Sequence, residues 1–263
     1  MMTALWTAAT GLDAQQRNVD VTANNLANVN TAGFKRSRAD FQDLFYSRFK
    51  EPGAQSATSG LFIPAGIQVG HGVANVATTL LFQQGTPQNT GRSLDVFIQD
   101  QTSMFQVQLP NGQIAYTRDG SFNRDAAGNI VTVAGYQLVP PMTVPAEAID
   151  VSINPNGIVE AVFTNQPNQQ LGQIQLAFFN NPGGLRQTGG NLYVQTDSSG
   201  PPTLGNPGDN QFGVLQSGFL ELSNVNAAEE LINLIKAQRA FDMNSRTIQT
   251  SDEMLQTTAA LRR

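Results

Sequence analysis

Cysteine is absent from this 263-residue sequence, and charged residues are scarce. Without cysteine there are no disulfides and no thiolate metal ligands. Asp, Glu, Lys and Arg make up 13% of the residues, whereas an average globular domain has about 25%. No apolar run reaches the roughly 18 residues that suggest a membrane-spanning helix. The sequence therefore predicts neither a disulfide-stapled scaffold nor a transmembrane helix.

Basic stretches are also missing. The N-terminal residues MMTALWTAATGLDAQQ contain no basic segment ahead of an apolar one, so we expect no cleavable signal peptide. The net charge is −5, and no run of Lys and Arg is interleaved with aromatic residues. Because binding to a phosphate backbone requires a basic surface, nucleic acid is not an expected partner.

The single histidine, His71, lies between Gly70 and Gly72. A Ser-His-Asp triad would need partners from distant parts of the chain, so a histidine in a surface loop is the better interpretation. No glycine motif for phosphate binding and no metal-ligand cluster is visible. We therefore predict no catalytic, cofactor or metal site.

Carboxylates of the middle region could pair as they do in glycosidases, but nothing in the sequence selects two of them. The candidates are Asp95, Asp119, Asp125 and Glu160. Asp119 and Asp125 lie just before glycines, where Asp accepts local backbone hydrogen bonds, so we interpret them as turn residues. The chain is not predicted to be an enzyme.

Amides carry most of the polarity, with 26 Gln and 23 Asn. Amides can face water in a monomer and hydrogen-bond across a contact after assembly, without the desolvation penalty of buried charge. This composition suits a surface that neighbours cover, although a compositional habit of the source organism explains it equally well.

Both ends of the chain show apolar residues at heptad spacing. From Met1 to about Asn28 these are Leu5, Leu12, Val19 and Leu26, and from about Asn226 to Leu261 they are Leu231, Leu234, Phe241, Ile248 and Leu255. The spacing predicts two helices, each with a narrow apolar seam, that pair along these seams. An ordinary helical hairpin in a monomer is the alternative. Polar seam positions such as Gln238, Ser245 and Asp252 favour additional helices from other copies.

The middle of the chain has short β-branched and aromatic runs that are separated by turn signals. The runs are VFIQ (96–99), MFQVQL (104–109), NIVTV (129–133), GIVEAVF (157–163), QIQLAFF (173–179) and NLYVQ (191–195). Turns are predicted at 111–112, 127–129, 156–157 and 182–184. Thr31–Gly33 predicts a further turn, 34–49 a helix or extended arm, and 52–72 a long loop or hairpin.

The predicted fold class is α+β. Paired N- and C-terminal coiled-coil-like helices form a discontinuous domain, and a mainly antiparallel β domain is inserted between them. The expected ranges are 1–40 and 220–263 for the terminal helical polymerisation domain, 41–73 for an extended arm or hairpin linker, and 74–219 for the β-rich domain.

Two segments closely resemble the conserved ends of the axial proteins of the bacterial flagellum, which form its rod, hook and hook-filament junction. The N-terminal match is AATGLDAQ at 8–15 and ANNLANVNTAGFKR at 23–36, and the C-terminal match covers 217–255 with SNVN and QRAF. The signature positions are Asn24, Asn25, Leu26, Ala27, Asn28, Gly33, Phe34, Ser223, Asn224, Val225, Asn226, Gln238, Arg239, Ala240 and Phe241.

Within this family, residues 44–73 are similar to the segment that distal rod proteins carry after the first helix. The chain is also much shorter than a hook protein, which has additional outer domains. Residues 79–99 and 112–122 resemble the family's entry into the β domain. Asp100–Met104 departs from the pattern, because the family has a glycine-rich tight turn there.

The resemblance implies a structural subunit of the flagellar distal rod, which polymerises into the helical drive shaft that transmits torque from motor to hook across the periplasm. It implies contacts with further copies, with proximal rod proteins, with the hook protein, and with the ring proteins of peptidoglycan and outer membrane. It also implies export by the flagellar type III apparatus without a cleavable signal peptide. We further hypothesise that 44–73 bridges adjacent subunits.

Two alternatives remain open at this stage. One is a proximal rod or hook-type axial subunit, and the other is a secreted β-domain binding module or glycan hydrolase.

Overall fold

The computed structural model describes residues 2–51, 65–164, 166–209 and 211–261, and it divides into two compact units. The first, which we call the helix unit, comprises residues 1–26, 37–79 and 227–263. The second, the β unit, comprises 27–36 and 80–226. The α+β prediction is confirmed, since a helix at each end of the chain flanks a mainly antiparallel β region.

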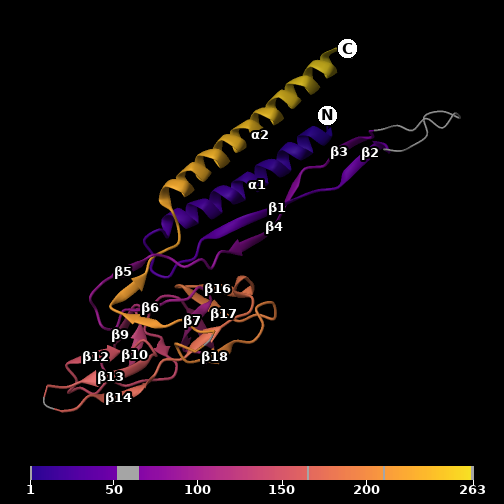
Figure 1. Cartoon of the computed structure of the whole chain (residues 1–263). Helices are drawn as coiled ribbons and strands as arrows, with labels where there is room; N and C mark the ends of the chain where they lie inside the picture. Colours follow the sequence, from indigo (N-terminus) through magenta and orange to yellow (C-terminus); the bar gives the residue numbers. More distant parts are fainter. Residues whose placement is uncertain (1, 52–64, 165, 210, 262–263) are drawn as a thin grey trace. The chain divides into compact units, whose positions relative to one another are not determined.

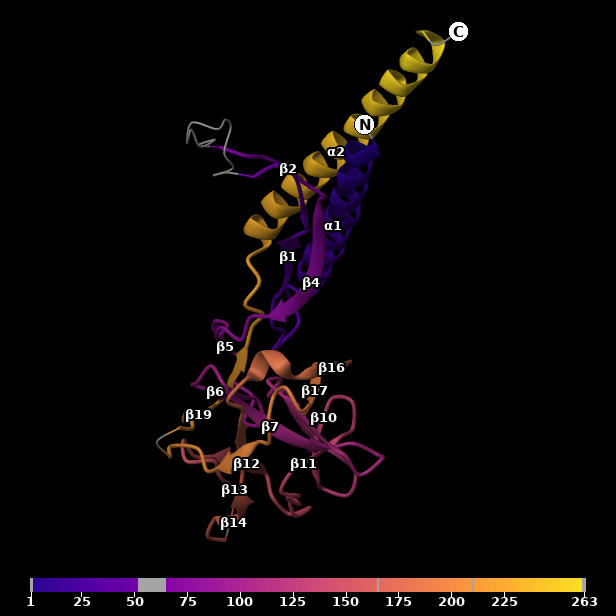
Figure 2. The ribbon, with the colours of Figure 1, turned by 90° about the vertical axis from the view of Figure 1, so that its right-hand side faces the viewer.

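Two antiparallel helices form the long axis of the helix unit, where α1 (Met2–Ala27) and α2 (Ala227–Leu261) lie side by side (Figures 1 and 2). Asn25 Nδ2 near the end of α1 lies 3.3 Å from Glu230 Oε2 near the start of α2. Further along, a Cβ at Gly11 would lie 2.9 Å from Asn244 Nδ2. The absence of a side chain at this position lets the helices approach closely.

Two pairs of strands complete the helix unit. β1 (Ser37–Asp43) pairs with β4 (Val73–Leu80), and β2 (Tyr46–Lys50) pairs antiparallel with β3 (Ile67–Gly70). Residues 34–49, for which the sequence left a helix or an extended arm open, thus contain strands. Tyr46 stands opposite Gly70 in a hairpin-like ladder. The part of the predicted loop or hairpin at 52–64, including PGAQS at 52–56, lies outside the described residues.

The β unit is built around a nine-stranded sheet. Its strands run in the order β16 (Arg186–Gly189), β17 (Leu192–Val194), β8 (Ile114–Thr117), β7 (Ser103–Gln108), β11 (Gln137–Leu138), β10 (Ile130–Thr132) and β9 (Phe122–Arg124), and β15 (Leu176–Phe178) pairs with both β7 and β18 (Thr203–Gly205). The pairings in this sheet are antiparallel.

The β unit also contains smaller antiparallel sheets. β12 (Asp150–Ile153), β13 (Ile158–Val162) and β14 (Gln169–Gln173) form a three-stranded sheet. β6 (Val96–Ile98) pairs with β19 (Leu215–Ser217), and β5 (Pro87–Asn89) pairs with β20 (Phe219–Glu221). A short 3-10 turn covers Pro182–Gly184. Residues on the C-terminal side of the β unit therefore pair back with strands from its N-terminal side.

The core of the β unit has two apolar clusters, separated by strands β7 and β8. Phe105 on β7 faces one cluster and meets Phe122 edge-on, with ring centroids 5.1 Å apart. The neighbouring Met104 faces the other, where Tyr116 on β8 meets Phe179 at 4.7 Å. Side chains alternate between the two faces of a strand, so β7 is buried on both of its faces from Ser103 to Val107.

Several turn predictions are confirmed. Gly112, Gly128 and Gly157 all have positive φ, at 80°, 89° and 78°, the conformation that glycine adopts at no steric cost. The run 173–179 was predicted as one strand, and this is wrong. β14 ends at Gln173 and β15 begins at Leu176, in a different sheet.

Candidate functional site

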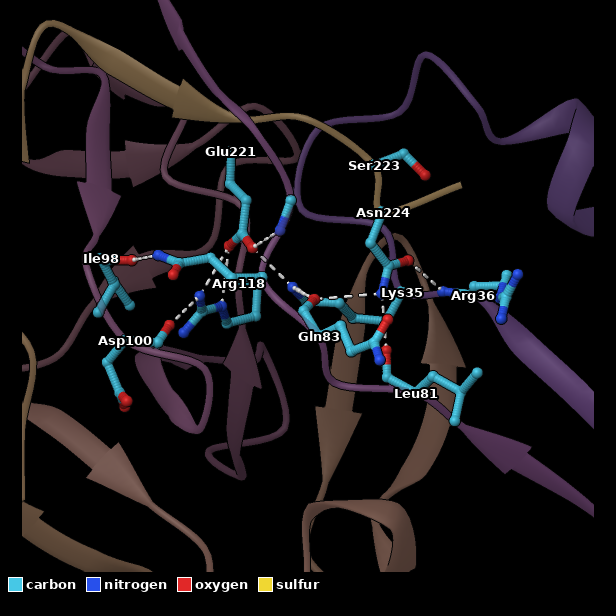
Figure 3. Close-up of polar contacts among 12 residues, drawn as sticks. Lys35, Arg36, Leu81, Gln83, Ile98, Asp100, Arg118, Glu221, Ser223 and Asn224 are labelled. Carbon is cyan, nitrogen blue, oxygen red and sulfur yellow. Dashed lines mark hydrogen bonds and ion pairs between the residues drawn. The ribbon is translucent and has the colours of Figure 1, made fainter. Parts of the chain in front are cut away.

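A buried ionic cluster joins distant segments of the β unit (Figure 3). Lys35 Nζ donates to Glu221 Oε1 at 2.6 Å, and Arg118 Nε and Nη2 both lie 2.9 Å from Glu221 Oε2. The two cationic side chains are 0% exposed and the carboxylate side chain 2%. Charges removed from water in this way require near-complete pairing, which the single carboxylate provides for both cations.

Backbone contacts extend this cluster to the segments that enter and leave the β unit. The Gly85 amide donates to Glu221 Oε1 at 2.8 Å, and the Gly33 amide donates to the Glu221 carbonyl at 2.8 Å. Gly33 has φ +68°, and a Cβ there would lie 2.6 Å from the Asp119 amide nitrogen. Only glycine therefore fits at this position without displacing the backbone beside Arg118.

Burial lowers the pKa of Lys35 from 10.5 to about 8, and the Glu221 carboxylate opposes this shift. Lys35 Nζ also donates to the Gln83 carbonyl at 2.8 Å. Both contacts lie within the β unit, so the ammonium ties residues 27–36 to the segment after β4 and to β20. The cluster therefore holds distant segments of the β unit together, and its charged side chains are not accessible to a substrate.

The segment that departs from the family pattern, Asp100–Met104, forms a tight bend through its own side chains. The Asp100 carboxylate accepts hydrogen bonds from the amides of Thr102 and Ser103 at 3.1 and 2.9 Å, and from their hydroxyls at 3.0 and 2.7 Å. Burial raises the pKa of Asp100, but the hydrogen bonds from Ser103 and Thr102 outweigh this effect and lower it overall. Arg118 donates to the carbonyls of Asp100 and Ser103.

Two signature asparagines replace missing backbone partners. In the helix unit, Asn25 accepts from the Ser37 amide at 2.9 Å and donates to the Ser37 carbonyl at 2.8 Å. In the β unit, Asn224 accepts from the Arg36 amide at 2.7 Å and donates to the Leu81 carbonyl at 2.8 Å. Each side chain therefore serves as a short piece of β-ladder where the chain leaves a helix or strand.

The remaining signature residues fall into three groups. Gly33, Phe34, Ser223 and Val225 are buried, Leu26, Asn28 and Ala240 are partly buried, and Asn24, Ala27, Asn226, Gln238, Arg239 and Phe241 are exposed. The buried members lie in the β unit, beside the ionic cluster in sequence. Lys35, Arg118 and Glu221 were not among the residues predicted from the sequence.

Large apolar side chains are exposed mainly on the helix unit. Fourteen of the nineteen such residues among those described belong to it: Trp6, Phe41, Phe45, Tyr46, Phe49, Ile67, Val69, Val76, Leu231, Ile232, Ile235, Phe241, Met243 and Met254. Extensive apolar exposure on one part of a protein marks an interaction surface. The helix unit is the candidate assembly surface of the chain.

The seam residues predicted from the heptads lie beside the contact between the two helices. Leu5, Leu12, Val19, Leu26, Leu234, Ile248 and Leu255 are partly buried, whereas Leu231 and Phe241 remain 46% and 38% exposed. The most buried positions are smaller or polar, such as Ala8 and Asn25 on α1 and Glu230, Ala237 and Ser251 on α2. Whether the seam residues form the polymerisation interface stays a prediction.

Three of the residues considered for catalysis, His71, Asp119 and Asp125, have hydrogen-bonding partners that account for their positions. His71 Nε2 lies 2.7 Å from Ser47 Oγ in the helix unit. Asp119 accepts from the Ser121 amide and Asp125 from the Asn129 amide, at 3.0 and 2.8 Å. These bonds confirm the interpretation of both aspartates as turn residues.

Family models match three parts of the chain. They are described as "Flagella basal body rod protein" (residues 5–35), "Flagellar hook protein FlgE/F/G D1 domain" (101–161) and "Flagellar basal body rod FlgEFG protein C-terminal" (216–261).

The match to whole proteins extends over nearly the full chain. The chain is 48% identical to the flagellar basal-body rod protein FlgG of Caulobacter vibrioides, with 99% of this chain and 100% of that protein covered. The FlgG protein of Buchnera aphidicola subsp. Schizaphis graminum is 47% identical (97% and 98% covered), and that of Bacillus subtilis is 38% identical (100% of both). The chain belongs to the flagellar basal-body rod protein family.

Flagellar basal-body rod proteins are structural components of the flagellum, and the chain is accordingly a structural protein and not an enzyme. The family also implies self-assembly into the rod and association with other flagellar components. Among the described residues, neither helix combines the length and apolar character that crossing a membrane requires. The exposed apolar surface of the helix unit thus belongs to a rod protein that assembles with copies of itself.

Proposed function

We propose that the chain is a subunit of the flagellar distal rod, which polymerises into the helical shaft that transmits torque from motor to hook across the periplasm. The observation that carries this proposal is the concentration of exposed apolar side chains on the helix unit. Similarity to rod proteins named FlgG, over nearly the whole chain, supports it.

A helical shaft needs a contact between two different surfaces of the same subunit, because such a contact repeats without closing. The two antiparallel helices provide several different faces, and the residues between α1 and α2 are mostly small or polar. Burial of the exposed apolar residues would stabilise contacts between copies at about 25 cal/mol per Å². The seam residues would contribute to the same contacts, above all Leu231 and Phe241, which are exposed.

The partners follow from this placement. Proximal rod proteins lie below the subunit and the hook protein above it, and the ring proteins of peptidoglycan and outer membrane surround the shaft. Export by the flagellar type III apparatus, without a cleavable signal peptide, delivers the chain. Residues 1–40 and 220–263 act as the polymerisation domain, 41–73 as an arm that bridges adjacent subunits, and 74–219 as the β-rich domain.

Replacement of Leu231 by Asp tests the proposal in cells that lack their own copy of the protein. Val133→Asp is the matched control, because Val133 is 73% exposed on the β unit. We expect the control to restore full-length rods in isolated basal bodies, and Leu231→Asp to leave rods without the distal part.

Two results would contradict the proposal. In basal bodies, labelled subunits below the distal segment or in the hook would favour a proximal rod or hook-type subunit. In the purified monomer, slow hydrogen exchange throughout 1–40 and 226–263 would indicate terminal helices that are stable without neighbours. Together with full-length rods in cells that lack the protein altogether, that result would favour a monomeric binding module.

A further inference from the structure

The side of α2 that faces away from α1 has an ordered stripe of its own. Glu230, Ala237 and Ser251, the most buried residues of α2, recur on one side of the helix. A helix advances about 100° per residue, given 3.6 residues per turn, so the opposite side comprises Ile232, Ile235, Arg239, Met243, Arg246 and Thr250. All six residues are exposed. We call them the α2 outer stripe.

The two arginines of the α2 outer stripe, Arg239 and Arg246, are seven residues apart. Neither has an ion-pair partner in the part of the chain that the structure describes. Apolar Ile235 and Met243 flank them, at 48% and 62% exposed. A partner for this stripe must therefore combine two acidic groups, about two helical turns apart, with a surface that accepts apolar contacts.

The side of α1 that faces away from α2 combines two acidic residues with apolar ones. Ala8, Gly11 and Asn25 face α2, and the opposite side comprises Trp6, Ala9, Asp13, Gln16 and Asp20, all of them exposed. We call these five residues the α1 outer stripe. Its two aspartates are also seven residues apart. Arg17 Nε donates to one carboxylate oxygen of Asp13 at 3.2 Å, which leaves the other oxygen available. Asp20 has no ion-pair partner among the described residues.

We propose that the α1 outer stripe of one copy packs antiparallel against the α2 outer stripe of a second copy, with Asp13 beside Arg246 and Asp20 beside Arg239. This inference rests on the proposed function, since it assumes a polar shaft in which all copies run in the same direction. Because α1 and α2 are antiparallel within a chain, they are then antiparallel between copies as well.

The spacing of the two stripes supports this register. With Asp13 opposite Arg246, Gln16 falls opposite Met243 and Ala9 opposite Thr250, so the intervals of three and four residues coincide along both helices. Trp6 comes next to Met254, which is 58% exposed, and methionine sulfur makes favourable contacts with aromatic rings. Both stripes also avoid the seam between α1 and α2, which the same subunit already uses.

A groove beside the α1 outer stripe leaves room for the partner helix. It has a volume of about 690 Å³ and is lined by Trp6, Ala9 and Asp13 of α1, by Leu44, and by residues of β4 from Val73 to Thr78. These residues all belong to the helix unit. Side chains of the α2 outer stripe can enter this groove beside the carboxylate of Asp13.

The register also fixes an axial displacement between neighbours. Within the chain, Asn25 meets Glu230 and Gly11 lies beside Asn244. The contact proposed between copies is shifted from this register by four residues, or about 6 Å at about 1.5 Å per residue. A displacement along the axis at each contact is what converts a closed ring into a helix.

Charge reversal tests the pairing in the full-length chain. One double variant combines Asp13→Arg with Asp20→Arg, and the other combines Arg239→Asp with Arg246→Asp. Either one places like charges opposite each other in the proposed contacts. We expect each to reduce the amount of subunit in assembled rods by about tenfold or more. A chain with all four substitutions should recover to within about threefold of the original, because the two ion pairs form again with opposite polarity. Four reversals that assemble no better than two would overturn the proposal.

Disulfide capture provides a second readout that does not depend on charge, and the chain has no cysteine of its own to interfere. Ala9→Cys with Thr250→Cys should give cross-linked multimers in assembled rods after oxidation, since a disulfide requires Cα atoms within about 7 Å. Ala9→Cys with Met243→Cys is the control, because it is out of register by seven residues. Equal cross-linking of both pairs, or none in rods that assemble normally, would refute the register.

The two proposals fail in different ways. If the unmodified chain forms no rod, the proposed function is wrong. If it forms rods that charge reversal leaves unchanged, the proposed function stands and the pairing of the outer stripes is wrong.

Discussion

The buried carboxylate of Glu221 makes a quantitative prediction about the stability of the β unit. Glu221→Gln keeps the shape of the side chain but removes the charge that Lys35 and Arg118 share, and both cations are 0% exposed. Removing one partner of a buried ion pair costs about 3–5 kcal/mol, because a charge is left uncompensated. The amide oxygen can still accept one hydrogen bond, so we expect about 3 kcal/mol, which corresponds to a fall of roughly 6–12 °C in Tm.

Urea unfolding of the full-length chain measures this change. The single tryptophan, Trp6, reports on the helix unit, and the buried Tyr116 and Tyr193 report on the β unit. Glu147→Gln is the matched control, since it removes the same charge from an exposed position of the β unit. We expect the control to change stability by no more than about 0.5 kcal/mol.

A second substitution tests whether the loss of stability in Glu221→Gln comes from cations that are left unpaired. If Glu221→Gln destabilises the chain because it leaves two cations unpaired, adding Lys35→Met should restore part of the loss, since one of those cations is then gone. A loss below about 1 kcal/mol for Glu221→Gln, or a further loss on adding Lys35→Met, would refute the reasoning about buried charge.

Three further predictions concern the same unit. Gly33→Ala should destabilise the chain by at least about 2 kcal/mol more than Gly91→Ala in urea unfolding, because both glycines have positive φ but only Gly33 has backbone atoms where a Cβ would lie. The pKa of Lys35 is about 8 in the folded state, against an ordinary value of 10.5. Between pH 8 and 10.5 the unfolded chain therefore binds more protons than the folded chain, so stability should rise with pH over this range. Lys35→Met should remove the rise. Burial raises the pKa of Tyr193 from 10.0 to about 12. The folded chain therefore retains the proton where the unfolded chain loses it, so stability should fall as the pH increases from 10 to 12. Tyr193→Phe should reduce the fall without abolishing it, because burial also raises the pKa of Tyr116.

The two terminal helices could be predicted from the sequence because their signal is local and repeats every seven residues. The faces that meet could not be identified in the same way. A search for apolar residues selects Leu12 and Leu234, whereas close approach of two backbones selects positions with little or no side chain, such as Gly11 and Ala237. Small residues therefore mark the contact between the helices, and the larger apolar residues lie at its margins.

The ionic cluster could not be predicted, because its three members come from distant parts of the chain and each is an unremarkable charged residue in the sequence. A weak signal was available. In a chain with few charges, Lys35 lies two residues after Gly33, and Glu221 lies two residues before the signature residue Ser223. The bend at Asp100 is a related case, because the sequence has no glycine there and the turn depends on the carboxylate hydrogen-bonding Thr102 and Ser103.

The abundance of amides also acquires a more specific meaning in the structure. A surface that neighbours cover was one interpretation of the composition, but Asn25 and Asn224 make their hydrogen bonds within the chain, to the backbone of residues 36–37 and 81. An asparagine can donate and accept at once, so it can stand in for a peptide group where a helix ends and no strand is adjacent. A carboxylate at either position could only accept, and the carbonyl of Ser37 or Leu81 would lose its donor. The chemistry of the amide therefore explains why Asn occupies both positions, one in each unit of the chain.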